Sequence, residues 1–230
     1  MPLEELAENI WIYEGETVSF FGLPYSTRMT VIRLMDNKLW IHSPEKITSG
    51  LKVELARLGE VAYLVSPNKL HHLYLDEWLK AYPDASNYAA PGLARKRSDI
   101  AFTKDLTDNP EDEWAGEIKQ TIFKGSPVME EVVFYHVKSS TLILTDLIEN
   151  FRPESFNRWQ RLVAKFTGIL APNGKTPVDW RASFLFGKDE ARASLAILIK
   201  WQPKNIVISH GECIYGQGVE FLVKSFSWLK

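Results

Sequence analysis

The chain has 230 residues, of which 45% are hydrophobic and 24% charged, a composition that allows a globular core. A formal net charge of −2 without long runs of like charge gives no reason to expect binding to nucleic acid or to a membrane. The first 15 residues lack the pattern of a signal peptide, no stretch approaches the about 18 apolar residues of a membrane span, and the one cysteine cannot form a disulfide within the chain. We expect a cytoplasmic protein with a single domain over residues 1–230.

Short strands dominate the first quarter of the chain. Residues 9–15 predict one strand, and residues 27–44 predict two strands joined by a turn at Asp36-Asn37. Residues 47–60 carry leucines at helical spacing, which predicts a helix.

Strands and helices alternate in the rest of the chain. Apolar or alternating runs predict strands at residues 61–67, 86–92, 117–125, 130–138, 140–148 and 205–212. Helical spacing predicts helices at residues 71–83, 156–170, 188–203 and 219–230. This order predicts an α/β sandwich whose sheets are covered by helices.

Four predicted strands end on or near residues that can bind a metal or move a proton. These residues are His42, His71 with His72, Asp146, and His210. Ligands of α/β folds bind beyond the strand ends, so these side chains can converge. Imidazoles and a carboxylate suit zinc, iron or manganese, although spacing alone fits unrelated polar strand ends equally well. The fifth histidine, His136, falls inside an alternating strand, where a structural role is expected.

The order of these segments resembles the metallo-β-lactamase superfamily over nearly the whole chain. The resemblance is to an uncharacterised branch, whose members carry segments similar to TRMTVIRL, LWIHSP, NKLHHL, EEVVFYH, TLILTDL, DWR and ISHG. It implies a four-layer αβ/βα sandwich with a site at one edge of two facing sheets.

The first metal motif of that superfamily, His-x-His-x-Asp-His, is altered in this chain. The resemblance places Pro67 and Lys69 at the first two histidines, His71 at the aspartate and His72 at the last histidine. One metal of the usual dinuclear centre therefore lacks its ligands from this motif.

The remaining ligand positions imply a single-metal site. The bridging aspartate of the superfamily matches Asp146, the late histidine matches His210, and the middle histidine has no counterpart in KGSPVMEE (residues 124–131). The resemblance thus implies one divalent metal, with zinc expected and iron or manganese as alternatives. Its implied ligands are His71, His72, Asp146 and His210.

Two further residues have implied catalytic roles. Lys69 would lie where a ligand of the lost metal sits, and its ammonium would partly replace that charge beside Asp146; an exposed loop lysine is the alternative. His42 stands where the superfamily commonly has an acidic residue, and it would carry a proton, ligate the metal or support a ligand, with a structural role as the alternative. Cys213 fits a buried small apolar role better than a ligand.

The resemblance implies a metal-dependent hydrolase acting on ester, thioester, lactone, amide or phosphoester bonds of a small-molecule substrate. A metal with an open coordination position would activate water, and Asp146, Lys69 and His42 would be the catalytic residues. Trp180 and Arg181 are candidates for substrate contact, or else a structural brace. The alternative function is a binding or regulatory module that keeps the fold with no metal or with a structural metal. Iron-dependent oxidation is a third possibility that no residue selects.

Overall fold

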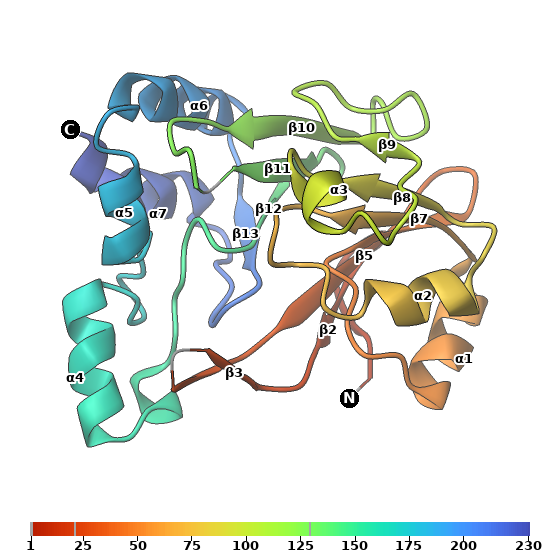
Figure 1. Cartoon of the computed structure of the whole chain (residues 1–230), viewed down its shortest axis with the longest axis horizontal. Coiled ribbons are helices and arrows are strands. Elements are labelled where there is room, and N and C mark those ends of the chain that lie inside the picture. The colour runs from red at the N-terminus through yellow and green to blue at the C-terminus, as the bar shows by residue number, and fades with distance from the viewer. Residues whose placement is uncertain (1, 21, 129) are drawn as a thin grey trace.

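Two β-sheets pack face to face in the computed structural model of the chain, which describes residues 2–20, 22–128 and 130–230 (Figure 1). The larger sheet has seven strands in the order β1-β2-β5-β6-β7-β8-β9, and the smaller has four in the order β10-β11-β12-β13. A short hairpin, β3-β4, forms a separate two-stranded sheet.

The strands and helices follow each other in mixed order along the chain. The strands are β1 (Glu4–Ala7), β2 (Ile10–Glu14), β3 (Val18–Phe20), β4 (Leu23–Tyr25), β5 (Arg28–Arg33), β6 (Lys38–His42), β7 (Glu60–Ser66), β8 (Ser86–Ala89), β9 (Lys104–Asp105), β10 (Ile118–Phe123), β11 (Glu131–His136), β12 (Thr141–Leu144) and β13 (Asn205–Ile208). The α-helices are α1 (Ser49–Leu58), α2 (Leu75–Ala81), α3 (Leu93–Lys96), α4 (Arg158–Thr167), α5 (Val178–Ser183), α6 (Lys188–Lys200) and α7 (Gly218–Ser225). Two short 3-10 helices are η1 (Pro153–Ser155) and η2 (Ser227–Leu229).

Strand β11 illustrates how the layers form. Successive side chains of a strand point to opposite faces of the sheet. Val132 and Phe134 therefore pack into the core between the sheets, while Val133 and Tyr135 pack into the core under the helices. Both faces are buried, which explains why the four central residues of this strand, 132–135, are all hydrophobic.

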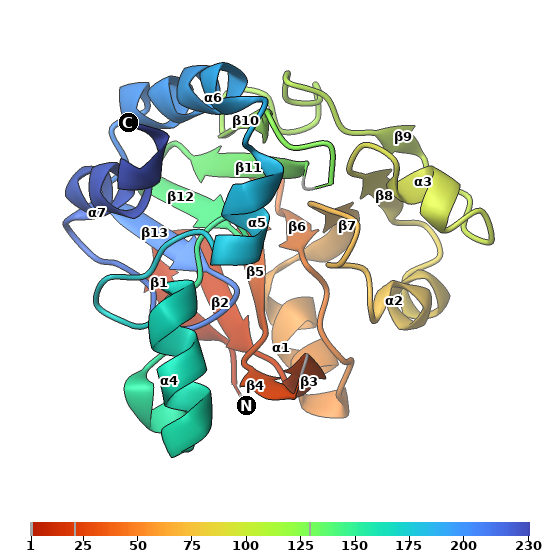
Figure 2. The same ribbon diagram turned by 60° about the vertical axis from the view of Figure 1, so that its left-hand side comes forward.

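Helices cover the outer face of each sheet. Leu51 and Leu55 of α1 and Trp78 of α2 pack against the larger sheet, while Leu198 of α6 and Leu222 of α7 pack against the smaller one. Figure 2 shows α1 and α2 on one side of the molecule and α6 and α7 on the other. The four-layer αβ/βα sandwich is confirmed.

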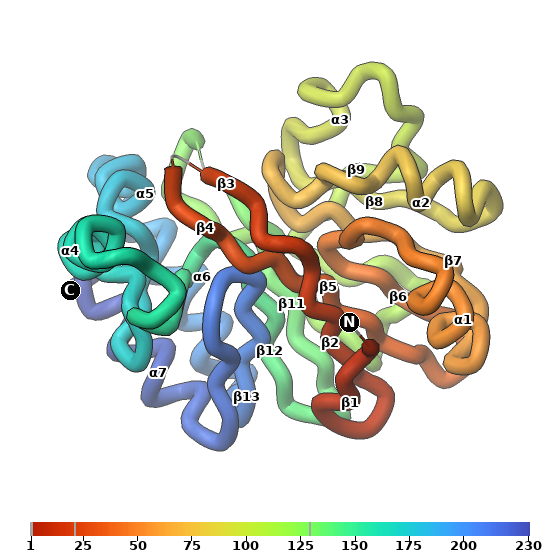
Figure 3. Tube along the Cα trace, turned by 90° about the horizontal axis from the view of Figure 1, so that it is seen from below, coloured from red at the N-terminus to blue at the C-terminus, as the bar shows by residue number. Residues whose placement is uncertain are grey.

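The predicted elements correspond closely to the observed ones, and the turn at Asp36-Asn37 joins β5 to β6 with Asn37 at a φ of 62°. The short elements that were not predicted are β1, β3, β4, β9, α3, α5 and η1. Figure 3 shows the β3-β4 hairpin crossing the molecule beside the loop that follows β13. No helix of the described residues has the length and apolar character needed to cross a bilayer.

Candidate metal centre

Two neighbouring parallel strands bring Asp146 and His210 together. In the pairing of β12 with β13, Leu144 lies opposite Ile208. Asp146 and His210 each follow two positions later, so they leave the sheet side by side.

The facing sheet delivers a second pair of residues to the same edge. Strands β6 and β7 are also parallel, with His42 opposite Val65. Ser43 follows β6 directly, and His71 lies on the turn between β7 and α2. Strand ends from both sheets thus form one site, as the sequence predicted.

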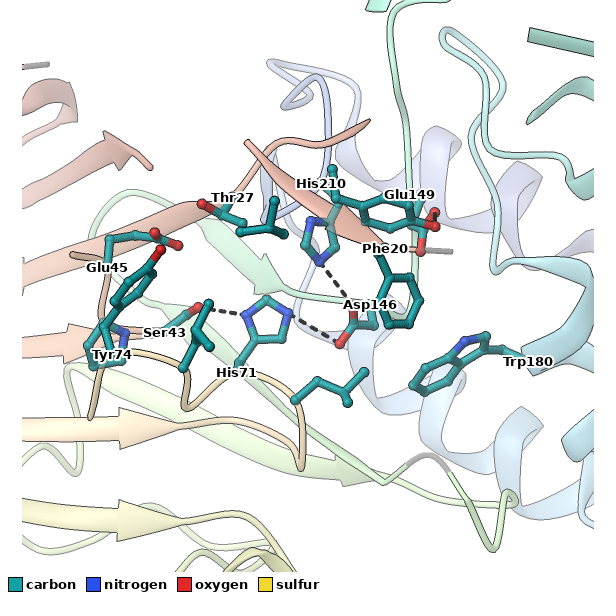
Figure 4. A pocket seen from close by; sticks show the side chains of 15 residues that line it. Phe20, Thr27, Ser43, Glu45, His71, Tyr74, Asp146, Glu149, Trp180 and His210 are labelled. Atoms are coloured by element: carbon teal, nitrogen blue, oxygen red, sulfur yellow. Dashed lines mark hydrogen bonds and ion pairs between the residues drawn. The ribbon is translucent and has the colours of Figure 1, made fainter. Parts of the chain in front are cut away.

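Asp146 lies between the imidazoles of His71 and His210 (Figure 4). Nε2 of His71 is 3.2 Å from one carboxylate oxygen, and Nε2 of His210 is 3.0 Å from the other. One ligand atom from each residue can be chosen so that all three lie within 4.8 Å of one another. All three side chains are less than a tenth exposed.

His210 faces Asp146 with a nitrogen that needs either a proton or a metal ion between itself and the carboxylate. Its Nδ1 lies 2.7 Å from the backbone oxygen of Ser26, which can only accept a hydrogen bond, so Nδ1 carries a proton. In a neutral ring Nε2 would then point a lone pair at the carboxylate, which is repulsive unless a proton or a metal ion lies between them. Burial alone would lower the pKa of His210, but the hydrogen bond and charge of Asp146 outweigh it and raise the pKa to about 9.

His71 is held by the strand end next to it. Its Nδ1 lies 2.6 Å from Oγ of Ser43, which leaves Nε2 directed at Asp146. Ser43 has a φ of 54°, a left-handed conformation that is unusual for a residue with a side chain. The strand end is thus bent to present its hydroxyl to the ring.

Asn68 ties the histidine turn to the carboxylate. Its Nδ2 donates to Asp146 at 2.6 Å, and its Oδ1 accepts from the backbone N–H groups of Leu70 and His71 at 2.8 and 3.0 Å. One amide therefore fixes both the turn that carries His71 and the carboxylate that His71 faces.

Glu131 fixes the backbone of the loop that carries Asp146. This fully buried carboxylate accepts hydrogen bonds from the backbone N–H groups of Thr145, Asp146 and Leu147. Burial and the nearby charge of Asp146 raise the pKa of Glu131, whereas these amides favour its ionised form. Asp146 itself keeps a pKa well below its ordinary value, because the two histidines outweigh the effect of burial.

Sequence reasoning missed both Asn68 and Glu131. Asn68 occupies a variable position of the altered motif. Glu131 lies in residues 124–131, the segment in which the middle histidine of the superfamily has no counterpart. The sequence carried no signal for Glu131, because a carboxylate at the start of an apolar strand can equally be exposed, as Glu60 is at the start of β7.

His72 points away from the cluster. Its Nδ1 lies 3.2 Å from Nη1 of Arg97, and burial with the charges of Lys96 and Arg97 lowers its pKa. Successive residues of the turn project in different directions, so the structure brings His71, Asp146 and His210 together and leaves His72 outside.

Lys69 and His42 do not line the cavity at the cluster. The side chain of Lys69 packs over Gly92, which precedes α3, and is therefore directed toward that helix. The backbone oxygen of Lys69 accepts a hydrogen bond from the side chain of Lys96. His42 is fully buried and stacks on Trp40, and neither of its ring nitrogens has a hydrogen-bond partner among the described residues. The catalytic roles predicted for these two residues find no support in this geometry.

The remaining candidates divide between the cavity and the scaffold. Trp180 lines the cavity beside Asp146 (Figure 4). Arg181 instead donates to the backbone oxygen of Thr167 and braces α5 against the end of α4. Cys213 packs against the core between the sheets.

A cavity of about 190 Å³ opens above the cluster. Most of its wall is apolar, and two further carboxyl groups, Glu45 and Glu149, line it. Burial raises the pKa of Glu45 to about 7 and that of Glu149 to about 8. The lining residues identified among the described part of the chain include no lysine or arginine. They are Val18, Phe20, Tyr25, Thr27, Ser43, Pro44, Glu45, Leu70, His71, Leu73, Tyr74, Asp146, Glu149, Trp180 and His210.

Sequence comparison assigns the chain to a family. The profile described as "Domain of unknown function (DUF4336)" matches residues 7–162. The chain belongs to the DUF4336 family. His71 and Asp146 lie inside the matched region of this DUF4336 chain, and His210 lies beyond it. No curated protein matches the sequence.

Solved structures similar to this DUF4336 chain include metallo-β-lactamases and a flavodiiron core. DIM-1 metallo-β-lactamase exposed to ceftazidime has a TM-score of 0.68 and 17% identity, covering 99% of this chain and 95% of that one. The mono-zinc form of FIM-1 from Pseudomonas aeruginosa has a TM-score of 0.67 and 9% identity, covering 99% and 94%. The metal-soaked Flv1 flavodiiron core from Synechocystis sp. PCC6803 has a TM-score of 0.65 and 14% identity, covering 99% and 60%. The chain therefore has the metallo-β-lactamase fold, at identities that show the fold alone.

Proposed function

We propose that the chain is a metal-dependent hydrolase with one divalent metal, held by His71, Asp146 and His210. The observation that carries the proposal is the orientation of His210. Its Nδ1–H donates to a backbone oxygen, so its Nε2 faces the Asp146 carboxylate, and either a metal ion or a proton must lie between them. The mono-zinc form of the similarly folded FIM-1 supports a single ion as a workable arrangement.

The donor set fits zinc and also iron or manganese. Two imidazole nitrogens and a carboxylate leave at least one coordination position for water or substrate. Ligand atoms around tetrahedral zinc are about 3.4 Å apart, given metal–ligand bonds of about 2.1 Å. The two His–Asp distances of 3.2 and 3.0 Å run to different carboxylate oxygens, and the three ligand atoms lie within 4.8 Å of one another, so the side chains would have to shift to share one ion.

A metal bound there would supply Lewis acidity and a water molecule with a lowered pKa. The protein residues have separate tasks around it. Ser43 and the backbone oxygen of Ser26 orient the two imidazoles, and Asn68 holds the carboxylate. Glu149, with its raised pKa of about 8, is largely protonated at neutral pH and can donate a proton to a leaving group.

The cavity favours an uncharged substrate with an apolar group. Its wall is mostly apolar, its titratable residues other than the histidines are acids and tyrosines, and no lysine or arginine was found among its lining. A phosphoester would meet no positive side chain in this wall. We therefore favour a small ester, thioester or lactone among the bonds that the fold resemblance implies.

One observation favours a second candidate, a binding module without metal. With His210 protonated, the Asp146 carboxylate has hydrogen-bond partners without a metal ion. It accepts hydrogen bonds from His210 and Asn68, and it contacts His71. The same pocket would then bind a small apolar ligand without turnover.

Metal analysis of protein purified without a histidine tag separates these candidates. We expect about one zinc, iron or manganese per chain, lost in Asp146→Ala and His210→Ala. His72→Ala is the matched control, because it removes the adjacent imidazole that points elsewhere and should retain the metal. No metal after loading would refute the hydrolase proposal and leave the binding module.

Turnover completes the test. The metal-loaded protein should hydrolyse members of an uncharged ester, thioester and lactone panel, and Asp146→Ala should not. A loaded protein that hydrolyses none of them would contradict catalysis while keeping the metal site.

A further inference from the structure

Helix α4 presents an apolar stripe to solvent. Trp159, Leu162, Val163 and Phe166 recur at the spacing of one helix face, and all four are exposed, Trp159 by 80% and Phe166 by 78%. Such a stripe ordinarily packs on the core of a globular protein. Here only Ala164 of the helix is buried.

The helix lies at the periphery of the fold, away from both sheets in Figures 1 and 3. It is attached through the small cluster that Ala164 forms with Tyr25, Phe151 and Phe156. A hydrogen bond from Gln160 to the backbone of the β3-β4 hairpin adds to this attachment. These contacts hold the helix in place and leave the side chains of its apolar stripe exposed.

Positive charge runs along one edge of the stripe. At 100° per residue, Arg158, Arg161 and Lys165 fall within about 60° of one another, next to the four apolar side chains. All three are exposed, and α4 contains no acidic residue. The net charge of −2 for the whole chain conceals this local excess.

The stripe also borders a route to the metal cavity. Trp159 and Val163 line an apolar groove of about 530 Å³ between α4, α5 and the β3-β4 hairpin. This groove and the metal cavity share Tyr25, Glu149 and Trp180 as lining residues. A molecule held at the outer surface of α4 would thus lie next to the site.

We propose that α4 binds the surface of an anionic lipid bilayer, lying in the headgroup plane with its apolar stripe inserted. A helix with an apolar face and adjacent cations binds such surfaces through buried apolar area and attraction to anionic lipid. Charge complementarity favours lipid over a second copy of the chain, because a second α4 would bring three more cations and no acidic residue. The proposal depends on neither the metal nor hydrolysis.

Co-sedimentation with vesicles tests this proposal. The full chain should bind phosphatidylcholine vesicles that contain phosphatidylglycerol much more strongly than pure phosphatidylcholine vesicles, and added salt should weaken binding. Leu162→Glu/Phe166→Glu should weaken binding at least about ten-fold, because it removes inserted apolar area and adds negative charge. Arg158→Gln/Lys165→Gln should remove most of the preference for the anionic vesicles.

The matched control is Val53→Glu, at an exposed apolar position of α1, which should bind as the unchanged chain does. Circular dichroism should show that every variant is folded, since all the altered side chains are exposed. Equal binding by Leu162→Glu/Phe166→Glu and the control, or no binding to anionic vesicles, would overturn the proposal. A dimer in solution that the same double variant dissociates would also overturn it, by assigning the stripe to a second copy.

Discussion

Glu149 and Glu45 are two buried carboxyl groups at different ends of one cavity. Glu149 accepts a hydrogen bond from the Tyr25 hydroxyl at 3.0 Å and lies three residues after Asp146, whereas Glu45 lies beyond Thr27 and Ser43 (Figure 4). Both have raised pKa values, so chemistry alone does not distinguish them as proton donors. Position does, since only Glu149 is on the loop that carries Asp146.

Glu149→Gln should slow hydrolysis most for substrates whose leaving group needs a proton. We expect turnover of an alkyl ester to fall about 100-fold, because a glutamine can keep the contact with Tyr25 but cannot donate a proton in the same way. Turnover of a nitrophenyl ester, whose leaving group departs as an anion, should change little. Steady-state rates with the two esters measure the difference.

Glu45→Gln serves as the control for that experiment, because it removes the other buried carboxyl group of the cavity. Glu45→Gln should change the turnover rates of the two esters by the same factor. An equal effect of Glu149→Gln on the two esters would exclude Glu149 as the acid.

The adjacent residues His71 and His72 show which features of the site the sequence can predict and which it cannot. The sequence predicts that His71, His72, Asp146 and His210 converge after buried strands, and the structure brings His71, Asp146 and His210 within 4.8 Å of one another. The sequence does not show that His71 points into the cavity while His72 turns to Arg97, because that depends on the dihedral angles of an irregular turn.

At the scale of elements, the start of β11 supports the end of β12. Glu131 lies at the first position of β11. Its carboxylate accepts hydrogen bonds from three backbone N–H groups of the loop that begins after β12. The loop that carries Asp146 therefore has its amides fixed by a side chain of the neighbouring strand.

Glu131→Gln should lower the free energy of unfolding by about 2–4 kcal/mol. The glutamine side chain would place its NH2 group where a carboxylate oxygen now accepts hydrogen bonds from the backbone N–H groups of the loop. At least one of these buried N–H groups would lose its acceptor, which lowers the stability of the folded state. Chemical denaturation measures the loss. The neighbouring Glu130→Gln is the control and should cost less than about 0.5 kcal/mol. Similar losses in both variants would show that the loop does not depend on Glu131.

The longer elements were predicted, and so were the four-residue strands β8, β12 and β13, whereas several other short elements were not. The periodicity of β11 or α6 extends over enough residues to identify each type. Strands β3 and β4 have only three residues each, and β4 contains Pro24, so no pattern could form. These short elements carry Phe20 and Tyr25, which line the cavity, so the substrate wall was less predictable than the metal cluster.

For the whole molecule, two histidines held neutral in the interior link stability to pH. Burial lowers the pKa of His136 to about 4, and burial lowers that of His42 well below its ordinary value. Unfolded histidines bind protons near pH 6.5, so between about pH 6.5 and pH 4 the unfolded chain binds more protons than the folded one. Their contribution to stability is therefore lost as the pH falls through that range.

His136→Gln should make stability less sensitive to acid. Between about pH 7 and about pH 5, the free energy of unfolding of the unchanged chain should fall about 2 kcal/mol more than that of the variant. Glu45 and Glu149, whose raised pKa values act in the opposite direction, cancel from this difference. Urea denaturation at the two pH values gives the comparison, and equal changes would show that His136 is protonated in the folded state.

The register of β12 with β13 has a consequence for the order in which the protein is made. Asp146 meets His210 only when β13 has joined the sheet, and the guanidinium of Arg28 contacts the backbone oxygen of Ile208 at the end of that strand. His71 and Asp146 leave the ribosome long before His210 does. A nascent chain that still lacks β13 therefore cannot hold an ion in the proposed manner. Metal loading would follow synthesis of the strand that precedes His210 rather than guide the folding of the earlier ones.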